Sequence, residues 1–300
     1  MRGKSLFRLA TAFAGFALIG AAPVPHPAPA AAHGHPAIWK LADKDTTIYL
    51  FGTFHLLPQG ENWRTPAFDK ALASSDELVM EIPNIDDANA LAQSMLKLAV
   101  QPGLPPLVER VPPEKRAGLK AMIAESGIPE PVLDRMKTWA AALLLDAVIF
   151  KRLHLDPNAG VEETLIGPWR KSGKPLEGLE TAEQQFGLFD HLSDSAQRAF
   201  LIDEVDELDK AKPEFDAMIR AWISGDVAGI ARTFNDDMKD SPELRKALLV
   251  DRNARWADWL KARMAKPGTL FVAVGAGHLA GPESVEAMLA TRGVKVTRVQ

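Results

Sequence analysis

The sequence predicts an α/β protein of the α+β kind, in which strands from both chain ends form one central sheet around a large, mainly helical insertion. Short β-branched and aromatic runs occur near each end of the chain, as expected for strands. Between residues 86 and 263, apolar residues recur at the spacing of amphipathic helices. The chain has 300 residues, 47% hydrophobic and 25% charged, which is the composition of an ordinary folded domain.

Two strands separated by a helix are expected first. Residues 46–51 are β-branched and aromatic and end at Gly52, which predicts a buried strand. Pro66 is well placed to start a helix over residues 66–73, because proline suits the first helical turn. Residues 77–82 predict a second strand, which Pro83 stops.

The middle of the chain is expected to be mainly helical. One short strand, residues 174–180, is predicted to interrupt it and to lead into a helix capped by Thr181. The predicted helices cover residues 87–100, 135–153, 160–170, 182–192, 195–208, 213–223 and 242–264.

Strand character returns at the end of the chain. Residues 269–275 are a continuous apolar run, which is typical of a strand covered on both faces. Residues 282–291 predict a helix that ends at Gly293, and residues 294–299 alternate as a last strand.

The first residues predict an export signal. Positive residues at the start precede an uncharged apolar run over residues 9–19 and small residues at 20–22, so residues 1–22 are expected to be a cleaved signal peptide. The apolar run is too short to span a bilayer as a stable helix. We therefore expect a periplasmic or secreted protein with no stable membrane anchor after cleavage, and an uncleaved anchor is the alternative.

Residues 23–37 predict a linker, and residues 38–300 predict the folded domain. The linker is rich in Pro, Ala and His and favours an extended conformation that buries no core. The chain has no Cys, so disulfides play no part in the fold. Its formal charge of −4 argues against a nucleic-acid partner, because there is no basic excess to neutralise phosphates.

Two Gly-x-x-His motifs carry the chemistry that the sequence predicts. Gly52 and His55 follow the first buried strand, and Gly275, Gly277 and His278 follow the last apolar strand. Carboxyl ends of parallel strands meet at the ligand-binding edge of an α/β sheet, so both imidazoles are expected in one crevice. The alternative is a pair of histidines that only cap backbone groups.

Acidic and basic side chains are expected beside the two histidines. Glu81 ends the second strand and is a candidate metal ligand or general base, and Glu180 ends the short middle strand. Arg252 and Asn253, on a long helix, are candidates for holding a substrate or its oxyanion. The alternatives are a salt-bridged carboxylate at a strand end and an ordinary surface arginine.

Several common catalytic motifs are absent from the sequence. There is no His-Glu-x-x-His, no Gly-x-Ser-x-Gly, no Cys nucleophile and no Gly-rich phosphate loop with Lys. Histidine and carboxylate chemistry remains, and such ligand sets suit divalent Zn, Mn or Co.

The chain resembles the TraB/GumN family in motifs that run in order from about residue 38 to residue 300. Residues 49–58 read YLFGTFHLLP and residues 272–281 read VAVGAGHLAG. The other matching residues are Glu81, the Gly-Leu-Glu-Thr of residues 178–181 with Gln184 or Gln185, and the pair Arg252 and Asn253. The TIKI-like metalloproteases of animals are similar in these motifs.

The resemblance implies a divalent metal held by His55, His278 and Glu81, with Glu81, Glu180 and Arg252 as catalytic groups. The expected function is an exported metal-dependent hydrolase, with a peptidase as the first choice and a peptide or other small molecule as substrate. A non-catalytic periplasmic binding protein for a peptide, a metal or a haem-like ligand is the alternative. Metal-free hydrolysis of the esterase type, assisted by His and Glu, is the third.

Overall fold

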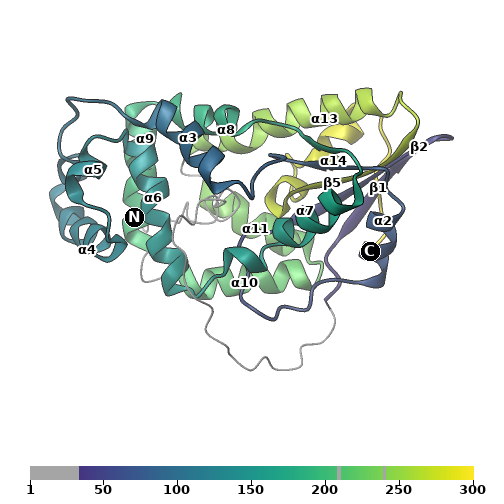
Figure 1. Cartoon of the computed structure of the whole chain (residues 1–300), viewed down its shortest axis with the longest axis horizontal. Helices are drawn as coiled ribbons and strands as arrows, with labels where there is room; N and C mark the ends of the chain where they lie inside the picture. Colours follow the sequence, from purple (N-terminus) through teal and green to yellow (C-terminus); the bar gives the residue numbers. More distant parts are fainter. Residues whose placement is uncertain (1–33, 208–210, 239–240) are drawn as a thin grey trace.

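The computed structural model describes residues 34–207, 211–238 and 241–300 (Figure 1). The predicted signal peptide and most of the predicted linker lie outside these residues. Residues 34–37 pack against the domain: the Gly34 N–H donates to the carbonyl of Asn62 at 2.9 Å, and the His35 N–H donates to the carbonyl of Ile223 at 2.8 Å. These last four residues of the predicted linker are therefore part of the fold.

Within the described residues, the strands form one mixed six-stranded sheet in the order β4-β3-β5-β2-β1-β6. The four strands β4, β3, β5 and β2 are parallel, and β1 and β6 are antiparallel to their neighbours. The strands are β1 (Ile38–Ala42), β2 (Thr46–Thr53), β3 (Glu77–Met80), β4 (Leu176–Gly178), β5 (Gly268–Gly275) and β6 (Thr297–Arg298).

The sheet joins the two ends of the chain, as the sequence predicts. Strand β2 pairs with β5 over its full length, from Thr46 beside Gly268 to Thr53 beside Gly275. Both strands are apolar and lie in the middle of the sheet, so helices cover them on both faces. The α+β class and the helical insertion between the terminal strands are confirmed.

The insertion lies to one side of the sheet in Figure 1, with α4, α5, α6 and α9 farthest from the strands. The helices of the insertion are α3 (Ala88–Ala99), α4 (Arg116–Ser126), α5 (Glu130–Asp134), α6 (Thr138–Arg152), α7 (Val161–Ser172), α8 (Ala182–Asp190), α9 (Asp194–Glu207), α10 (Ala211–Ile223), α11 (Val227–Met238) and α12 (Pro242–Arg245). The helices α2 (Pro66–Ala73), α13 (Asp251–Arg263) and α14 (Val285–Thr291) pack close to the sheet.

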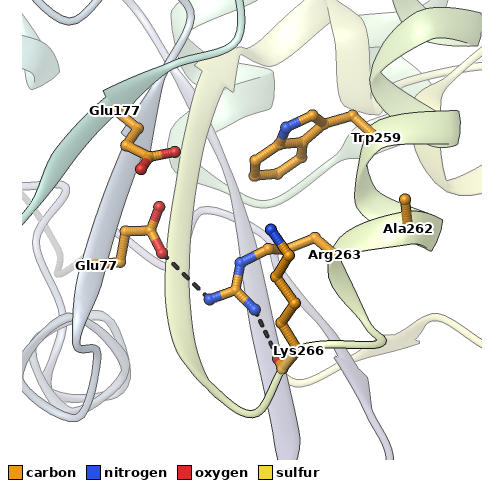
Figure 2. Close-up of a pocket in the computed structure, with 6 residues that line it drawn as sticks. All are labelled: Glu77, Glu177, Trp259, Ala262, Arg263 and Lys266. Atoms are coloured by element: carbon orange, nitrogen blue, oxygen red, sulfur yellow. Dashed lines mark hydrogen bonds and ion pairs between the residues drawn. The ribbon is translucent and has the colours of Figure 1, made fainter.

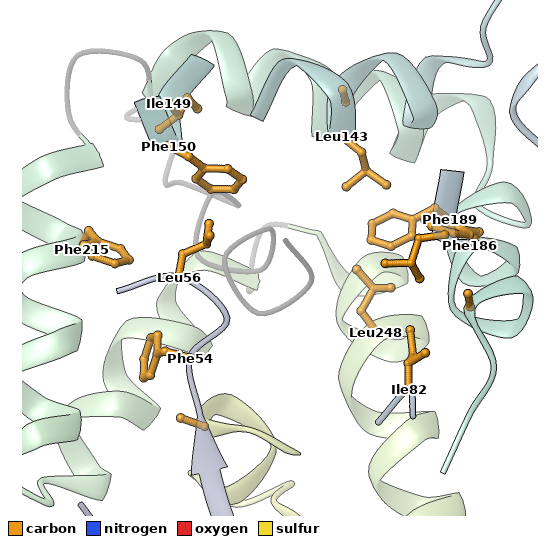
Figure 3. Close-up of a cluster of buried hydrophobic side chains, with 14 of the residues drawn as sticks. Phe54, Leu56, Ile82, Leu143, Ile149, Phe150, Phe186, Phe189, Phe215 and Leu248 are labelled. Carbon is orange, nitrogen blue, oxygen red and sulfur yellow. The ribbon is translucent and has the colours of Figure 1, made fainter. Parts of the chain in front are cut away.

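Two hydrophobic cores lie on the two faces of the sheet. The smaller core packs Leu50 and Val272 of the sheet against Leu260 of α13 and Leu289 of α14. The larger core joins the other face to the insertion. Figure 3 shows part of it, where Phe54 and Leu56, from the loop after β2, lie in one cluster with Phe150 and Phe215 of the insertion. The loop that carries the first Gly-x-x-His motif is therefore fixed by apolar packing.

Several element boundaries differ from the prediction. Strand β1 is not predicted by the sequence pattern. Strand β6 has two residues where six were predicted, because it is the edge strand and pairs with β1 at Trp39 and Lys40. The helix predicted over residues 242–264 contains a π-helical turn at Lys246–Val250, directly before α13. Such turns are frequent at functional sites.

Gly52 gives the first prediction, because its backbone lies against the second motif. A Cβ on Gly52 would lie 2.9 Å from the Cα of Ala276, a backbone atom that cannot move aside cheaply. We expect Gly52→Ala to lower the free energy of unfolding by about 1–3 kcal/mol, as overpacking does elsewhere. Urea denaturation would measure this loss.

The matched control is Gly167→Ala in α7. A Cβ there meets no atom within 4 Å, so alanine should stabilise the helix by about 0.5–1 kcal/mol. Equal losses of stability in the two variants would contradict the close approach at Gly52.

Candidate active site at the carboxyl end of the sheet

The structure brings the predicted site residues to one edge of the sheet. His55 follows β2, Glu81 follows β3, Glu180 follows β4, and His278 follows β5 in a short 3-10 helix. These four strands are parallel neighbours, so their carboxyl ends meet. The site thus lies where α/β sheets place their ligands, as the sequence predicts.

Arg252 of α13 lies at the centre of the cluster and is completely buried. Its Nη2 donates to Glu81 Oε2 at 2.5 Å, and its Nε donates to Glu180 Oε2 at 2.9 Å. Its Nη1 lies 3.0 Å from His278 Nε2. One guanidinium therefore holds together groups that follow three different strands.

Glu81 is ionised at neutral pH. Burial raises the pKa of its carboxyl, but the charge of Arg252, helped by the two histidines and a backbone hydrogen bond from Gly275, lowers that pKa to about 2. The Gly275 N–H donates to Oε1 at 2.6 Å. Gln185 donates from Nε2 to Oε2 of Glu81 at 3.1 Å and to Oε2 of Glu180 at 3.2 Å, so it bridges the two carboxylates.

His278 is neutral, and its contacts fix its tautomer. A guanidinium only donates hydrogen bonds, so His278 Nε2 accepts from Arg252 and the proton must lie on Nδ1. Nδ1 then donates to Asn253 Oδ1 at 2.6 Å. Burial, with the charge of Arg252, lowers the pKa of His278 to about 3. The lone pair on Nε2 is therefore present throughout the physiological pH range.

Asn253 lies behind His278 and is completely buried. Its Oδ1 accepts from the imidazole, and its Nδ2 donates to the carbonyl of Glu283 at 2.7 Å. The sequence predicts Asn253 as a substrate contact, whereas its contacts in the fold are those of a residue that orients an imidazole.

His55 contacts a carboxylate that the sequence analysis did not identify. Its Nδ1 lies 2.9 Å from Oε1 of Glu162, and both side chains are 6% exposed. Glu162 lies in the first turn of α7, where acidic residues are common because they favour the helix dipole. The sequence therefore gives little reason to single out Glu162 as a partner of His55. The one indication is its place directly after Gly160 and Val161, at a buried helix start.

The cluster approaches solvent at Glu180. The Oε1 atom of Glu180 accepts from Nη2 of Arg255 at 3.0 Å, and the side chain of Arg255 is 54% exposed. Arg252, one turn earlier on α13, has no exposed surface. Any substrate that reaches the cluster from this side therefore meets Arg255 first.

A separate cavity of about 370 Å³ lies at the other end of β3 (Figure 2). Glu77 begins β3 and Glu81 follows it, so the cavity and the cluster lie at opposite ends of one strand. In the cavity, Nη2 of Arg263 lies 3.2 Å from Oε2 of Glu77. The lining residues are Glu77, Glu177, Trp259, Ala262, Arg263 and Lys266.

The donor set fits a divalent metal ion in kind. Two imidazoles and a carboxylate are ligands that Zn, Mn and Co accept. His278 Nε2 and Glu81 Oε1 are 3.9 Å apart, close to the roughly 3.4 Å between neighbouring ligands in a tetrahedral site. In the described part of the chain, no three His, Asp or Glu side chains form a complete ligand set, and His278 Nε2 is shared with Arg252. Arg252 is thus the competitor of a metal at this atom.

Comparison with known proteins agrees with the motifs. The profile of the TraB/PrgY/gumN family matches residues 37–298. The chain is 26% identical over 247 residues to the uncharacterized protein YbaP of Escherichia coli (strain K12), covering 81% of this chain and 87% of YbaP. It is 22% identical over 272 residues to an uncharacterized protein of Treponema pallidum (strain Nichols), covering 84% of this chain and 80% of that protein. No solved structure matches the chain.

Removal of Arg252 should be costly because it leaves Glu81 buried without its guanidinium partner and leaves Glu180 with the half-exposed Arg255 alone. We expect Arg252→Met to lower the free energy of unfolding by about 3–5 kcal/mol at neutral pH. The pKa of Glu81 is lowered to about 2 in the fold, so its contribution is present above its ordinary pKa of 4.5 and is lost as pH falls through 2. Between these two pH values, Glu81 is protonated in the variant but still ionised in the wild type. The variant then buries no unpaired Glu81 charge, so the difference in the free energy of unfolding between the two proteins should be smaller than at neutral pH.

Urea denaturation of both proteins at neutral pH and at pH values between 4.5 and about 2 would measure these differences. Arg255→Met is the matched control, because this half-exposed arginine contacts the same Glu180 and should cost less than about 1 kcal/mol. A loss of stability for Arg252→Met that does not change with pH would contradict the assigned charges.

Proposed function

This chain belongs to the TraB/PrgY/gumN family, and we propose that it is a metal-dependent hydrolase whose active site is the buried cluster around Arg252. The observation that carries the proposal is the convergence of His55, His278, Glu81 and Glu180 from four neighbouring strand ends. Neutral imidazole, ionised carboxylate and a buried guanidinium are the groups that hydrolysis needs. A peptide is the substrate that we propose first.

His55, His278 and Glu81 would hold the divalent ion, with Zn, Mn or Co as candidates. Such an ion, when bound, supplies a Lewis acid. At neutral pH, the uncharged Nε2 of His278 and the ionised carboxylate of Glu81 are both in the form that can donate an electron pair to a metal ion. The resemblance to the TIKI-like metalloproteases stays a prediction, and it agrees with this assignment.

The remaining polar groups have separate roles in the proposal. Glu180 contacts the half-exposed Arg255 and would accept a proton from the attacking water. Arg252 would stabilise the oxyanion that develops on the substrate, because a guanidinium offers fixed donors in a site from which water is excluded. Asn253 would keep His278 oriented.

Export to the periplasm or the medium is part of the proposal and depends on residues 1–22. In residues 34–207, 211–238 and 241–300, no helix has both the length and the apolar character that a membrane span requires.

The second candidate is a binding protein without turnover. The saturation of both carboxylates by Arg252 favours it, because a preformed charged cluster can anchor a ligand without activating water. The candidate ligands are a peptide, a metal or a haem-like molecule.

Metal content tests the proposed ligands. Protein purified without a metal-affinity tag should contain about one divalent ion per chain, as catalytic sites do. The double variant His55→Ala, His278→Ala should lose the ion and keep its circular dichroism spectrum. His191→Ala is the control, because this residue is exposed at the end of α8 and should leave the metal content unchanged. Unchanged metal content in the double variant would remove the metal from the proposal.

Turnover is tested with a peptide library, with and without a chelator. Cleavage should stop in the chelator and return when the metal is restored. Glu180→Gln should lower the cleavage rate by roughly 10²–10⁴-fold and keep the bound metal, since only the proton acceptor is changed. Cleavage that persists in the chelator would favour metal-free hydrolysis of the esterase type. Retained ligand affinity without cleavage in any protein would favour the binding protein.

A further inference from the structure

The two motif histidines are held by outer side chains of different charge. The Nδ1 atom of His278 contacts Asn253, and the Nδ1 atom of His55 lies beside Glu162. A ring whose Nδ1 faces outward presents Nε2 to the opposite side. The structure thus places a polar side chain at Nδ1 of each motif histidine, a neutral amide at His278 and a carboxylate at His55.

At His278 the device is complete. Asn253 Oδ1 accepts a hydrogen bond from the ring Nδ1–H, and Asn253 Nδ2 donates to the carbonyl of Glu283, which fixes the orientation of the amide. Nε2 of the ring then faces Arg252. This network fixes the Nδ1–H tautomer without any charge on the outer residue.

At His55 the corresponding group is Glu162. Its Oε1 lies 2.9 Å from Nδ1, an ion-pair distance, although the contact lacks the geometry of a linear hydrogen bond. The other oxygen, Oε2, is buried and has no hydrogen-bond partner among the described residues. A buried carboxylate with an unused oxygen is costly, so a purely structural origin explains it poorly.

The position of Glu162 is set by the same loop that carries His55. Helix α7 begins directly against this loop, because the Val161 N–H donates to the carbonyl of Phe54 at 3.0 Å. Glu162 is therefore held in the first helical turn, where the helix dipole favours a negative charge. Neither partner can move far without moving the other.

We propose that Glu162 is a positioning residue that fixes His55 in the Nδ1–H tautomer and directs its Nε2 into the cluster. If the proposed function holds, the consequence is that the two imidazoles bind the metal with unequal strength. This consequence, unlike the tautomer itself, rests on the proposed function. A carboxylate partner raises the basicity of an imidazole more than an amide does, so His55 is the stronger donor. His278, held by Asn253 and beside Arg252, is the weaker one.

The tautomer is tested on metal-free protein by long-range ¹H–¹⁵N NMR of the histidine rings at about pH 8, where imidazoles are neutral. His55→Asn assigns the His55 signals. We expect the Nδ1–H tautomer in the wild type, its retention in Glu162→Gln, whose amide oxygen still accepts, and its loss in Glu162→Ala. Asn253→Ala is the matched control, which should change the His278 signals and leave those of His55.

The Nε2–H tautomer at His55 in the wild type, or an unchanged tautomer in Glu162→Ala, would overturn the proposal. The wild-type spectrum decides alone if the alanine variant does not fold. Cobalt titration, followed by the visible absorption of bound Co²⁺, gives the second readout: Glu162→Ala should bind about 10–100-fold more weakly, and Glu162→Gln should lose less. If wild-type protein binds no cobalt, the proposed function fails, and the NMR result still decides the role of Glu162.

Discussion

The buried guanidinium of Arg252 is the interaction on which the site depends. It contacts Glu81, Glu180 and His278, which follow β3, β4 and β5, so it connects three strand ends to α13. A buried ion pair adds little net stability, because desolvation offsets much of the attraction. Its effect is to specify one arrangement, since any other would leave a buried charge without a partner.

Comparison with a second buried acid, Asp146, shows that the charge of Glu81 depends on its partner Arg252 more than on burial. Asp146 of α6 is 1% exposed, and burial raises its pKa to about 7. Glu81 is 4% exposed, yet Arg252 and its other neighbours lower its pKa to about 2. Equal burial thus gives opposite shifts. In the candidate active site, the guanidinium of Arg252 keeps the buried carboxylate of Glu81 ionised at neutral pH.

The sequence predicts the parts of the site that depend on backbone pattern. Strands ending in Gly-x-x-His can be recognised from composition, and the parallel pairing of β2 and β5 then brings the motifs together. The contacts between side chains are less predictable. Asn253 and Glu162 lie in helices where their residue types are ordinary, and only the packed fold shows that each faces an imidazole. The π-helical turn before α13 also has no sequence pattern of its own.

In the proposed function, a metal ion bound at His278 would free one N–H group of Arg252 to contact the substrate oxyanion. His278 Nε2 has one lone pair, so it serves either Nη1 of Arg252 or a divalent ion. Release of this contact leaves Nε on Glu180 and Nη2 on Glu81, because those bonds use other atoms of the fork. The guanidinium would keep its place and gain a donor at Nη1, beside the atom that the ion takes. Arg252 would thereby hold the cluster together without the ion and offer a hydrogen bond to the substrate when the ion is bound.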